Sequence, residues 1–306
     1  MRKPTPNKRI HYANFVYHYY LLGMQEKDTI HIIQSVFLRI EKLINRIEEN
    51  FDQEAIHDFR VDIKKLRAFL RLINHEPSFT GNLKIPKQLK KIYTACGSIR
   101  DLQLQIGRMK VLCVDTDPPN EYLELLEKNL RSETQKCKAL FKYLQLQKGI
   151  NTCTTLLPTV LSKDCFTNFF KEKVTGCLTI LTRVAITDTS MHSMRKNIKD
   201  IIYIYKIYDE YIKTKVPAPV WNKTEFSKAL QEAQTLGLYN DQCIAIGFLQ
   251  AGWLKKVNLK ERKLLQTIRK NWLLENEQIR NNLPQKLTIL YKKYGLDAPA
   301  ENNDKN

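Results

Sequence analysis

The chain has 306 residues, and 43% of them are hydrophobic, which is enough to build a core in one large domain or in two. Its 50 lysine and arginine residues outnumber its 32 acidic residues. The resulting net charge of +18 predicts a polyanionic partner such as nucleic acid, polyphosphate or an anionic membrane. The seven cysteines are scattered and form no Cys-x-x-Cys or His/Cys cluster, so neither a disulfide framework nor a zinc site is supported. No stretch reaches about 18 uncharged apolar residues, and we expect a soluble cytoplasmic protein without a membrane span.

Residues 1–22 combine cations with aromatic side chains. Aromatic rings stack on bases while cations contact phosphates, so this segment is compatible with binding to a nucleic-acid strand. We favour the alternative, a basic tail whose aromatic residues pack on the folded domain. The cations are Arg2, Lys3, Lys8 and Arg9, and the aromatic residues are Tyr12, Phe15, Tyr17, Tyr19 and Tyr20.

Two amphipathic helices are predicted next. Apolar residues recur at steps of three and four between Met24 and Glu49, which indicates a helix with one buried stripe. A second helix is predicted from about Gln53 to Asn74. At about 100° per residue, one histidine and four cations of this helix share an arc of roughly 80° and stand roughly 5–6 Å apart. We call this set the first ladder: His57, Arg60, Lys64, Arg67 and Arg71.

The remaining elements are also predicted to be helical. A third helix runs from about Pro86 to Leu112 and carries Arg100, and a fourth follows a proline pair and continues to about Gln147. The threonine-rich stretch 151–163 is assigned to no element. No strand alternation is present, so the predicted class is all-α, with a disordered polar tail at 296–306. In the second half, helices are predicted at 164–184, from the capping cluster 187–190 to about Lys213, at 224–255 and at 259–294, with an extended connection at 216–220.

The helix after residue 190 repeats the spacing of the first ladder. From His192, the same offsets lead to Arg195, Lys199 and Lys206, whereas Ile202 stands where a cation is expected. Four of the five positions therefore recur. We call His192, Arg195, Lys199 and Lys206 the second ladder.

A second landmark repeats as well. The run from Gly97 to Asp101 follows the first ladder, and the run from Gly237 to Asp241 follows the second, with Asn240 in the place of Arg100. The two histidines that open the ladders are 135 residues apart, and the two aspartates are 140 apart. Such agreement predicts a duplicated unit with small changes in its loops.

These motifs resemble the conserved histidine α-helical domain family, CHAD, over about residues 24–293. The resemblance implies two related four-helix bundles, at 24–149 and 150–295, and binding of inorganic polyphosphate. Ile202 and Asn240 depart from the family pattern, so we expect the second half to bind more weakly. The resemblance assigns polyphosphate binding to the first ladder and to the matching residues Arg100, His192, Arg195, Lys196 and Lys199, with Lys206 added by the ladder spacing and Tyr203 as a further motif match.

An enzyme is the weaker class for this chain. No His-Glu-x-x-His motif, Walker loop or nucleophile elbow is present, and we predict no catalytic residue, cofactor or metal site. Asp101 and Asp241 could form a carboxylate pair for acid–base work, but we favour a role in orienting a histidine or arginine of the neighbouring ladder.

Three functions fit the net charge: polyphosphate binding, nucleic-acid binding and an unrecognised phosphohydrolase. A regularly repeated anion without bases needs a row of cations, whereas base readout or strand binding needs polar side chains or aromatic rings aimed at bases. We therefore predict a polyphosphate-binding protein associated with polyphosphate granules. Nonspecific nucleic-acid binding is the alternative, because the electrostatic contribution is common to both. The ladder histidines could add charge near neutral pH, and the oligomeric state is left open.

Overall fold

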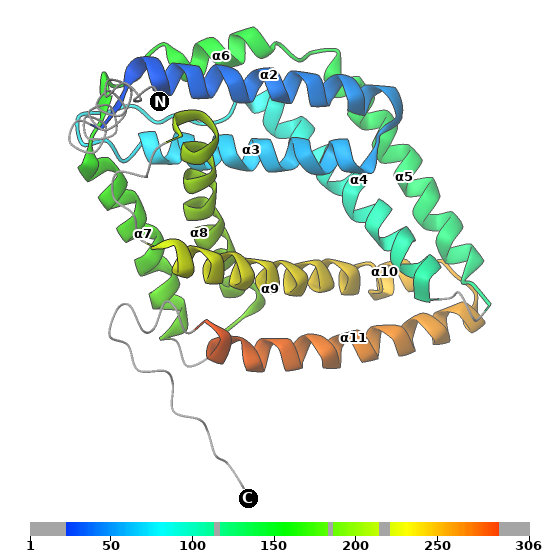
Figure 1. The fold of residues 1–306 in the computed structure, drawn as a ribbon. Helices are drawn as coiled ribbons and strands as arrows, with labels where there is room; N and C mark the ends of the chain where they lie inside the picture. Colours follow the sequence, from blue (N-terminus) through cyan, green and yellow to red (C-terminus); the bar gives the residue numbers. More distant parts are fainter. Residues whose placement is uncertain (1–22, 113–116, 183–185, 214–220, 288–306) are drawn as a thin grey trace, which may run out of the picture.

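The computed structural model describes residues 23–112, 117–182, 186–213 and 221–287. The predicted tails 1–22 and 296–306 and the predicted connection 216–220 lie outside the described residues. The described part is dominated by helices, which confirms the all-α class (Figure 1). Its first half contains β1 (Met24–Gln25), α2 (Glu26–Asn50), α3 (Gln53–Ile73), α4 (Lys87–Leu112), α5 (Asn120–Phe141) and α6 (Leu146–Thr154). Its second half contains β2 (Val160–Leu161), α7 (Lys163–Leu181), α8 (Asp188–Ile207), the π-helix η1 (Tyr208–Ile212), α9 (Lys223–Gly247), α10 (Ala251–Leu254) and α11 (Leu259–Lys286).

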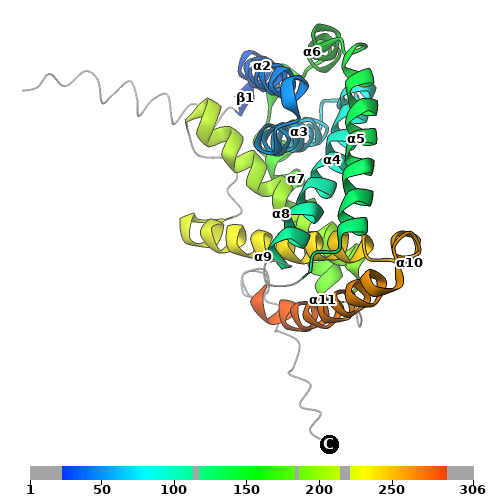
Figure 2. The same cartoon turned by 90° about the vertical axis from the view of Figure 1, so that its right-hand side faces the viewer.

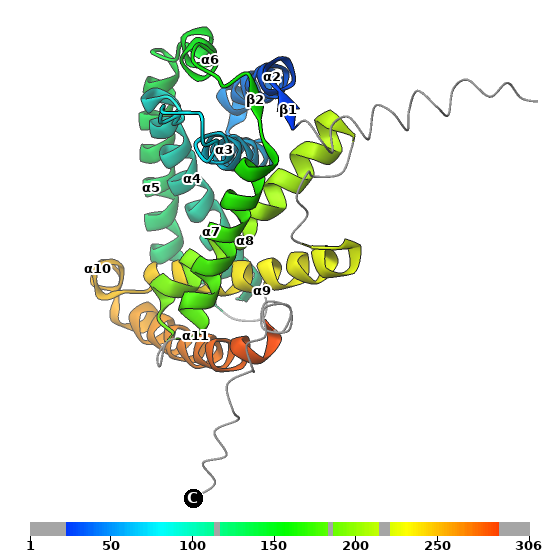
Figure 3. The same cartoon turned by 90° about the vertical axis from the view of Figure 1, so that its left-hand side faces the viewer.

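The helices pack as antiparallel pairs around the molecule. In Figure 1 the pair α2 and α3 lies opposite the pair α9 and α11. Two further pairs, α4 with α5 and α7 with α8, run between these two pairs. The side views in Figures 2 and 3 show the same arrangement, with α8 passing beside α3. Because α3 and α8 contact each other, the two helices that carry the ladders are direct neighbours.

One large hydrophobic core spans both halves of the chain. It joins Phe37 on α2, Phe69 on α3, Phe166 on α7 and Ile201 on α8, all of them almost fully buried. A smaller core lies where the ends of α4 and α5 meet α9, α10 and α11. The predicted boundary between residues 149 and 150 falls inside α6, and the division into two bundles stays a prediction.

The start of the described chain is held by a short antiparallel pair that sequence periodicity did not indicate. Met24 pairs with Leu161, and Gln25 pairs with Val160. Gly23 precedes this pair with φ of +75°, and a Cβ there would lie 2.0 Å from the carbonyl oxygen of Leu161. A glycine is therefore required for the close approach of the two segments.

Two predicted helix boundaries are wrong, and tertiary contacts explain both. The fourth helix ends at Phe141, and α6 continues through Gly149, where a Cβ would lie 3.0 Å from Pro86 and 3.1 Å from Phe37. Gly149 thus allows α6 to approach α2 instead of ending a helix. The helix predicted at 224–255 is divided by a turn after Gly247, and the carbonyl of Phe248 in this turn accepts a hydrogen bond from the Tyr122 hydroxyl at 3.0 Å.

The position where the second ladder lacks a cation belongs to the core. Ile202 is fully buried, whereas Arg67, at the same offset in the first ladder, is half-buried. The two helices therefore present different surroundings at this position.

We expect Ile202→Arg to lower the free energy of unfolding by about 3 kcal/mol or more, because a guanidinium there would be buried without a carboxylate partner. Urea unfolding followed by circular dichroism measures the change. Ile202→Leu is the matched control and should cost less than about 1.5 kcal/mol. Unchanged stability of the arginine variant would mean that its side chain reaches solvent and that the ladder equivalence extends to this position.

Candidate functional site

Side chains of both ladders line one cavity of about 670 Å³. Its walls come from α3, α4, α8 and α9, which are distant in sequence and adjacent in space. We call it the ladder cavity. The predicted site residues that line it are His57, Arg60, Lys64, Arg100, His192 and Arg195.

The cations in the ladder cavity are not neutralised by close carboxylates. Among the described residues, Arg60, Lys64, Arg100 and Arg195 form no ion pair within 4.0 Å. Nη1 of Arg100 and Nε of Arg195 are buried and have no hydrogen-bond partner in the same part of the chain. Buried donors and charges are normally paired, so this arrangement favours a site that receives an anion.

Burial and cations of both ladders act together on Lys64. Burial, followed by the positive charges of Arg60, Arg195 and Lys199, lowers the pKa of Lys64 from 10.5 to about 8. Burial also lowers the pKa of Lys199, with Arg195 and Lys206 adding to the effect. Two of the cations that depress the pKa of Lys64 belong to the second ladder, so the two ladders act electrostatically on the same group.

Both ladder histidines are held toward the neutral form. Burial and then the charge of Arg100 lower the pKa of His57. Burial likewise lowers the pKa of His192, against a raising effect of its hydrogen bond to Asn240. In that bond Nδ1 of His192 donates to Oδ1 of Asn240 at 2.7 Å, which leaves Nε2 as the other polar atom of the ring. A bound anion would favour the protonated form of both rings.

Glycines allow an arginine of each ladder to lie against the next helix. A Cβ at Gly97 would lie 2.2 Å from Nη1 of Arg60, which also donates to the carbonyl of Tyr93 at 3.1 Å. A Cβ at Gly237 would lie 3.6 Å from Nε of Arg195. The repeated glycine thus lies against the equivalent arginine in each half. The arginine approaches the glycine closely in the first half and at ordinary contact distance in the second.

The other predicted site residues lie outside the ladder cavity. Arg67 stands 5.7 Å from the centre of the Tyr93 ring, and the guanidinium of Arg71 donates to the buried carboxylate of Asp200 at 2.7 Å. The charge of Arg71 is therefore already compensated. Lys196 and Lys206 are exposed on α8, and Lys199 of the second ladder is half-buried.

Carboxylates also line the ladder cavity, and they do not pair closely with the cations. Burial raises the pKa of Asp101, against the lowering effect of Arg60. Asp188 accepts a hydrogen bond from the Tyr239 hydroxyl. The partner of His192 is Asn240 rather than Asp241, so the orienting role predicted for the aspartates stays a prediction.

Sequence reasoning missed Arg108, Tyr93 and the contact made by Asn240. Arg108 lines the ladder cavity, and the Tyr93 ring lies 4.8 Å from the guanidinium carbon of Arg60. Tyr93, Arg100 and Arg108 are spaced by seven and eight residues on α4, which puts them on one face of that helix. Helical spacing could therefore have indicated Arg108, whereas the Asn240 contact depends on how α8 meets α9.

The arrangement can bind an anion that has several negatively charged groups. Arginine forks clasp phosphate oxygens, and lysine supplies a mobile point charge. Within the described ranges, no group of three or more His, Cys, Asp or Glu side chains is arranged to hold a metal ion. In those same ranges, no helix is both long enough and apolar enough to cross a membrane.

Comparisons with known proteins agree with this architecture. The family model of the CHAD domain matches residues 32–250. The crystal structure of the CHAD domain from the plant Ricinus communis has a similar fold, with a TM-score of 0.66 at 16% identity. The match covers 90% of this chain and 94% of the plant chain. No curated protein sequence matches the chain.

The depressed pKa of Lys64 predicts a pH dependence of stability. The unfolded chain, in which this lysine titrates near 10.5, binds its proton more tightly than the folded protein, in which the pKa is about 8. The contribution of Lys64 to the free energy of unfolding should therefore rise as pH increases from about 8 toward 10.5. Lys64→Met should remove this rise.

Urea unfolding at about pH 7 and about pH 9.5, without polyanion, measures the difference between the two proteins. Lys196→Met, which removes an exposed lysine from α8, is the matched control and should follow the wild-type protein. The same rise in wild type and Lys64→Met would mean that Lys64 keeps its ordinary pKa.

Proposed function

We propose that this chain, which belongs to the CHAD domain family, binds inorganic polyphosphate in the ladder cavity and acts as a binding protein rather than an enzyme. The observation that carries the proposal is the convergence of Arg60, Lys64, Arg100 and Arg195 on one cavity without close carboxylate partners. A linear polyphosphate presents charged oxygens at short, regular intervals, so it can contact cations from both ladders at once.

The surroundings of the two tyrosines that line the cavity favour polyphosphate over nucleic acid. Nucleic-acid strands usually gain affinity from bases that stack on open aromatic rings. Tyr93 and Tyr239 line the cavity, but the guanidinium groups of Arg60 and Arg67 lie 4.8 and 5.7 Å from the ring centre of Tyr93, and Tyr239 is buried. Nonspecific nucleic-acid binding is the second candidate, because the net charge of +18 attracts any polyanion.

The two halves of the chain place unequal numbers of cations in the ladder cavity. Arg60, Lys64, Arg100 and Arg108 enter the cavity from the first half, whereas Arg195 is the arginine that enters it from the second. The first ladder should therefore contribute more to affinity than the second. A polyphosphate-binding protein of this kind would associate with polyphosphate granules in the cytoplasm.

Replacing Arg60, Lys64 and Arg100 together with glutamine should weaken polyphosphate binding by about a hundredfold, because three charges are removed from the ladder cavity. Arg71 is left in place, since its removal would leave Asp200 buried and unpaired. Fluorescence anisotropy with labelled long-chain polyphosphate at two salt concentrations measures affinity and its salt dependence.

The matched control replaces Arg2, Lys3 and Lys8 with glutamine, which removes the same number of charges from the tail. Equal losses from both triple variants would show that net charge, rather than the ladder cavity, governs binding. Competition with single-stranded DNA separates the two candidate ligands. DNA that displaces polyphosphate at equal phosphate concentration would favour the second candidate.

Gly97→Ala should weaken polyphosphate binding about five- to tenfold, because the new methyl group displaces the end of the Arg60 side chain. Stability should be kept or raised, since alanine favours a helix over glycine. Gly237→Ala is the matched control, because its methyl group would meet Arg195 at ordinary contact distance, and its affinity should stay within about twofold of wild type. The same loss in both variants would contradict the positioning role of Gly97.

A further inference from the structure

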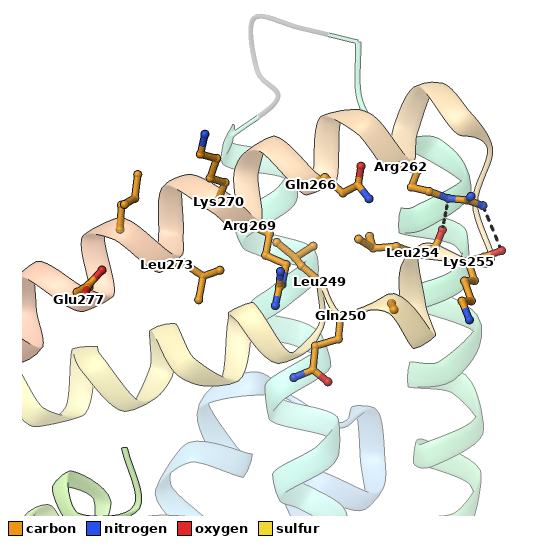
Figure 4. Close-up of a pocket in the computed structure, with 12 residues that line it drawn as sticks. Leu249, Gln250, Leu254, Lys255, Arg262, Gln266, Arg269, Lys270, Leu273 and Glu277 are labelled. Carbon is orange, nitrogen blue, oxygen red and sulfur yellow. Dashed lines mark hydrogen bonds between the residues drawn. The ribbon is translucent and has the colours of Figure 1, made fainter. Parts of the chain in front are cut away.

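A second cavity of about 670 Å³ lies between α11 and the turn that follows α9 (Figure 4). None of its lining residues belongs to the ladder cavity. Its volume is in the range of small-molecule sites, about 300–1,000 Å³. It is therefore large enough to hold a compact organic ligand. Such a ligand would not compete for the residues that line the ladder cavity.

Leucine side chains form the apolar part of this cavity. Leu249 and Leu254 are buried and contribute to the smaller core, whereas Leu273 and Leu274 on α11 keep 41% and 53% of their surface exposed. The exposed surface of Leu273 and Leu274 favours a ligand with an apolar body, because filling the hollow removes this surface from water.

One arginine, Arg269, is placed to bind an anionic group beside these leucines. Figure 4 shows Arg269 pointing from α11 toward the turn that carries Leu249 and Gln250, whereas Lys270 points away from it. Nε of Arg269 is buried and has no hydrogen-bond partner among the described residues. A buried donor of this kind is normally satisfied, so it indicates a missing acceptor.

The neighbouring charges set the direction of a ligand in the cavity. Arg262 is committed to the fold, since its Nε donates to the carbonyl of Leu254 at 2.9 Å and its Nη2 to that of Val257 at 3.1 Å. Glu277 lies eight residues beyond Arg269 on α11, at the far end of the lining in Figure 4. An anionic head is therefore favoured near Arg269, with the apolar body along the leucines.

We propose that the cavity between α11 and the turn after α9 binds a small organic anion with an apolar body, of the class of medium-chain carboxylates. The head group accepts hydrogen bonds from Arg269, and the chain packs against Leu249, Leu254 and Leu273. This site is separate from the ladder cavity, so the two can be tested independently.

The test uses the full chain and the fluorescent anion 8-anilinonaphthalene-1-sulfonate as a probe. We expect saturable binding with one dye per chain, and displacement of the dye by decanoate. Decylammonium has the same chain with the opposite charge, acetate has the same charge without the chain, and both should displace the dye poorly. Equal displacement by decanoate and decylammonium would overturn the proposal.

Variants connect the binding to this cavity. Arg269→Gln should weaken decanoate binding about tenfold, whereas Lys263→Gln, which removes an exposed charge from the same helix, should leave it unchanged. Leu273→Gln changes a partly exposed side chain and should also weaken binding, with thermal unfolding as the check on the fold. Equal affinities of the Arg269 and Lys263 variants would contradict the site.

Long-chain polyphosphate provides the last control. It should leave the dye in place, because the ladder cavity shares no lining residue with this site. Displacement of the dye by polyphosphate would place the dye in the ladder cavity and overturn this proposal, without affecting the proposed function.

Discussion

The packing of α3 against α8 brings cations of both ladders into one cavity, and the rest of the structure accommodates their repulsion. Unit charges at about 4 Å repel by about 4 kcal/mol at an effective dielectric constant of about 20. The contact persists because the same two helices bury Phe69 and Ile201 in a core shared by both halves. Hydrophobic burial on one side of each helix therefore holds unneutralised cations on the other.

Acidic partners divide the cations of α3 into two groups. Arg71 pairs with Asp200 at 2.7 Å, and Lys65 pairs with Glu210 at 2.8 Å, so the cations that bridge α3 to the chain around α8 are compensated. Arg60 and Lys64 face the cavity without such partners. Paired charges thus hold the helices in register, while unpaired charges remain for an anion.

The duplicated pattern gives the two halves related but unequal parts in the lining of the ladder cavity. Arg60 lies tightly against Gly97, and Arg195 lies more loosely against Gly237. Where the first half places Arg100, the second places Asn240, whose oxygen accepts a hydrogen bond from His192. In place of a cation, the second half has a contact that orients its own histidine, in line with the smaller contribution that we propose for it.

The sequence by itself determined the helical class, both ladders and the repeat, because a 3.6-residue period fixes which side chains share a helix face. Tertiary structure alone decided what each face meets. It placed Ile202 in the core, paired Arg71 with Asp200, carried α6 through Gly149 and set Arg108 in the cavity. The physical reason is that helical spacing defines directions around one axis, whereas burial, pairing and pKa depend on the neighbouring helix, which the local pattern does not specify.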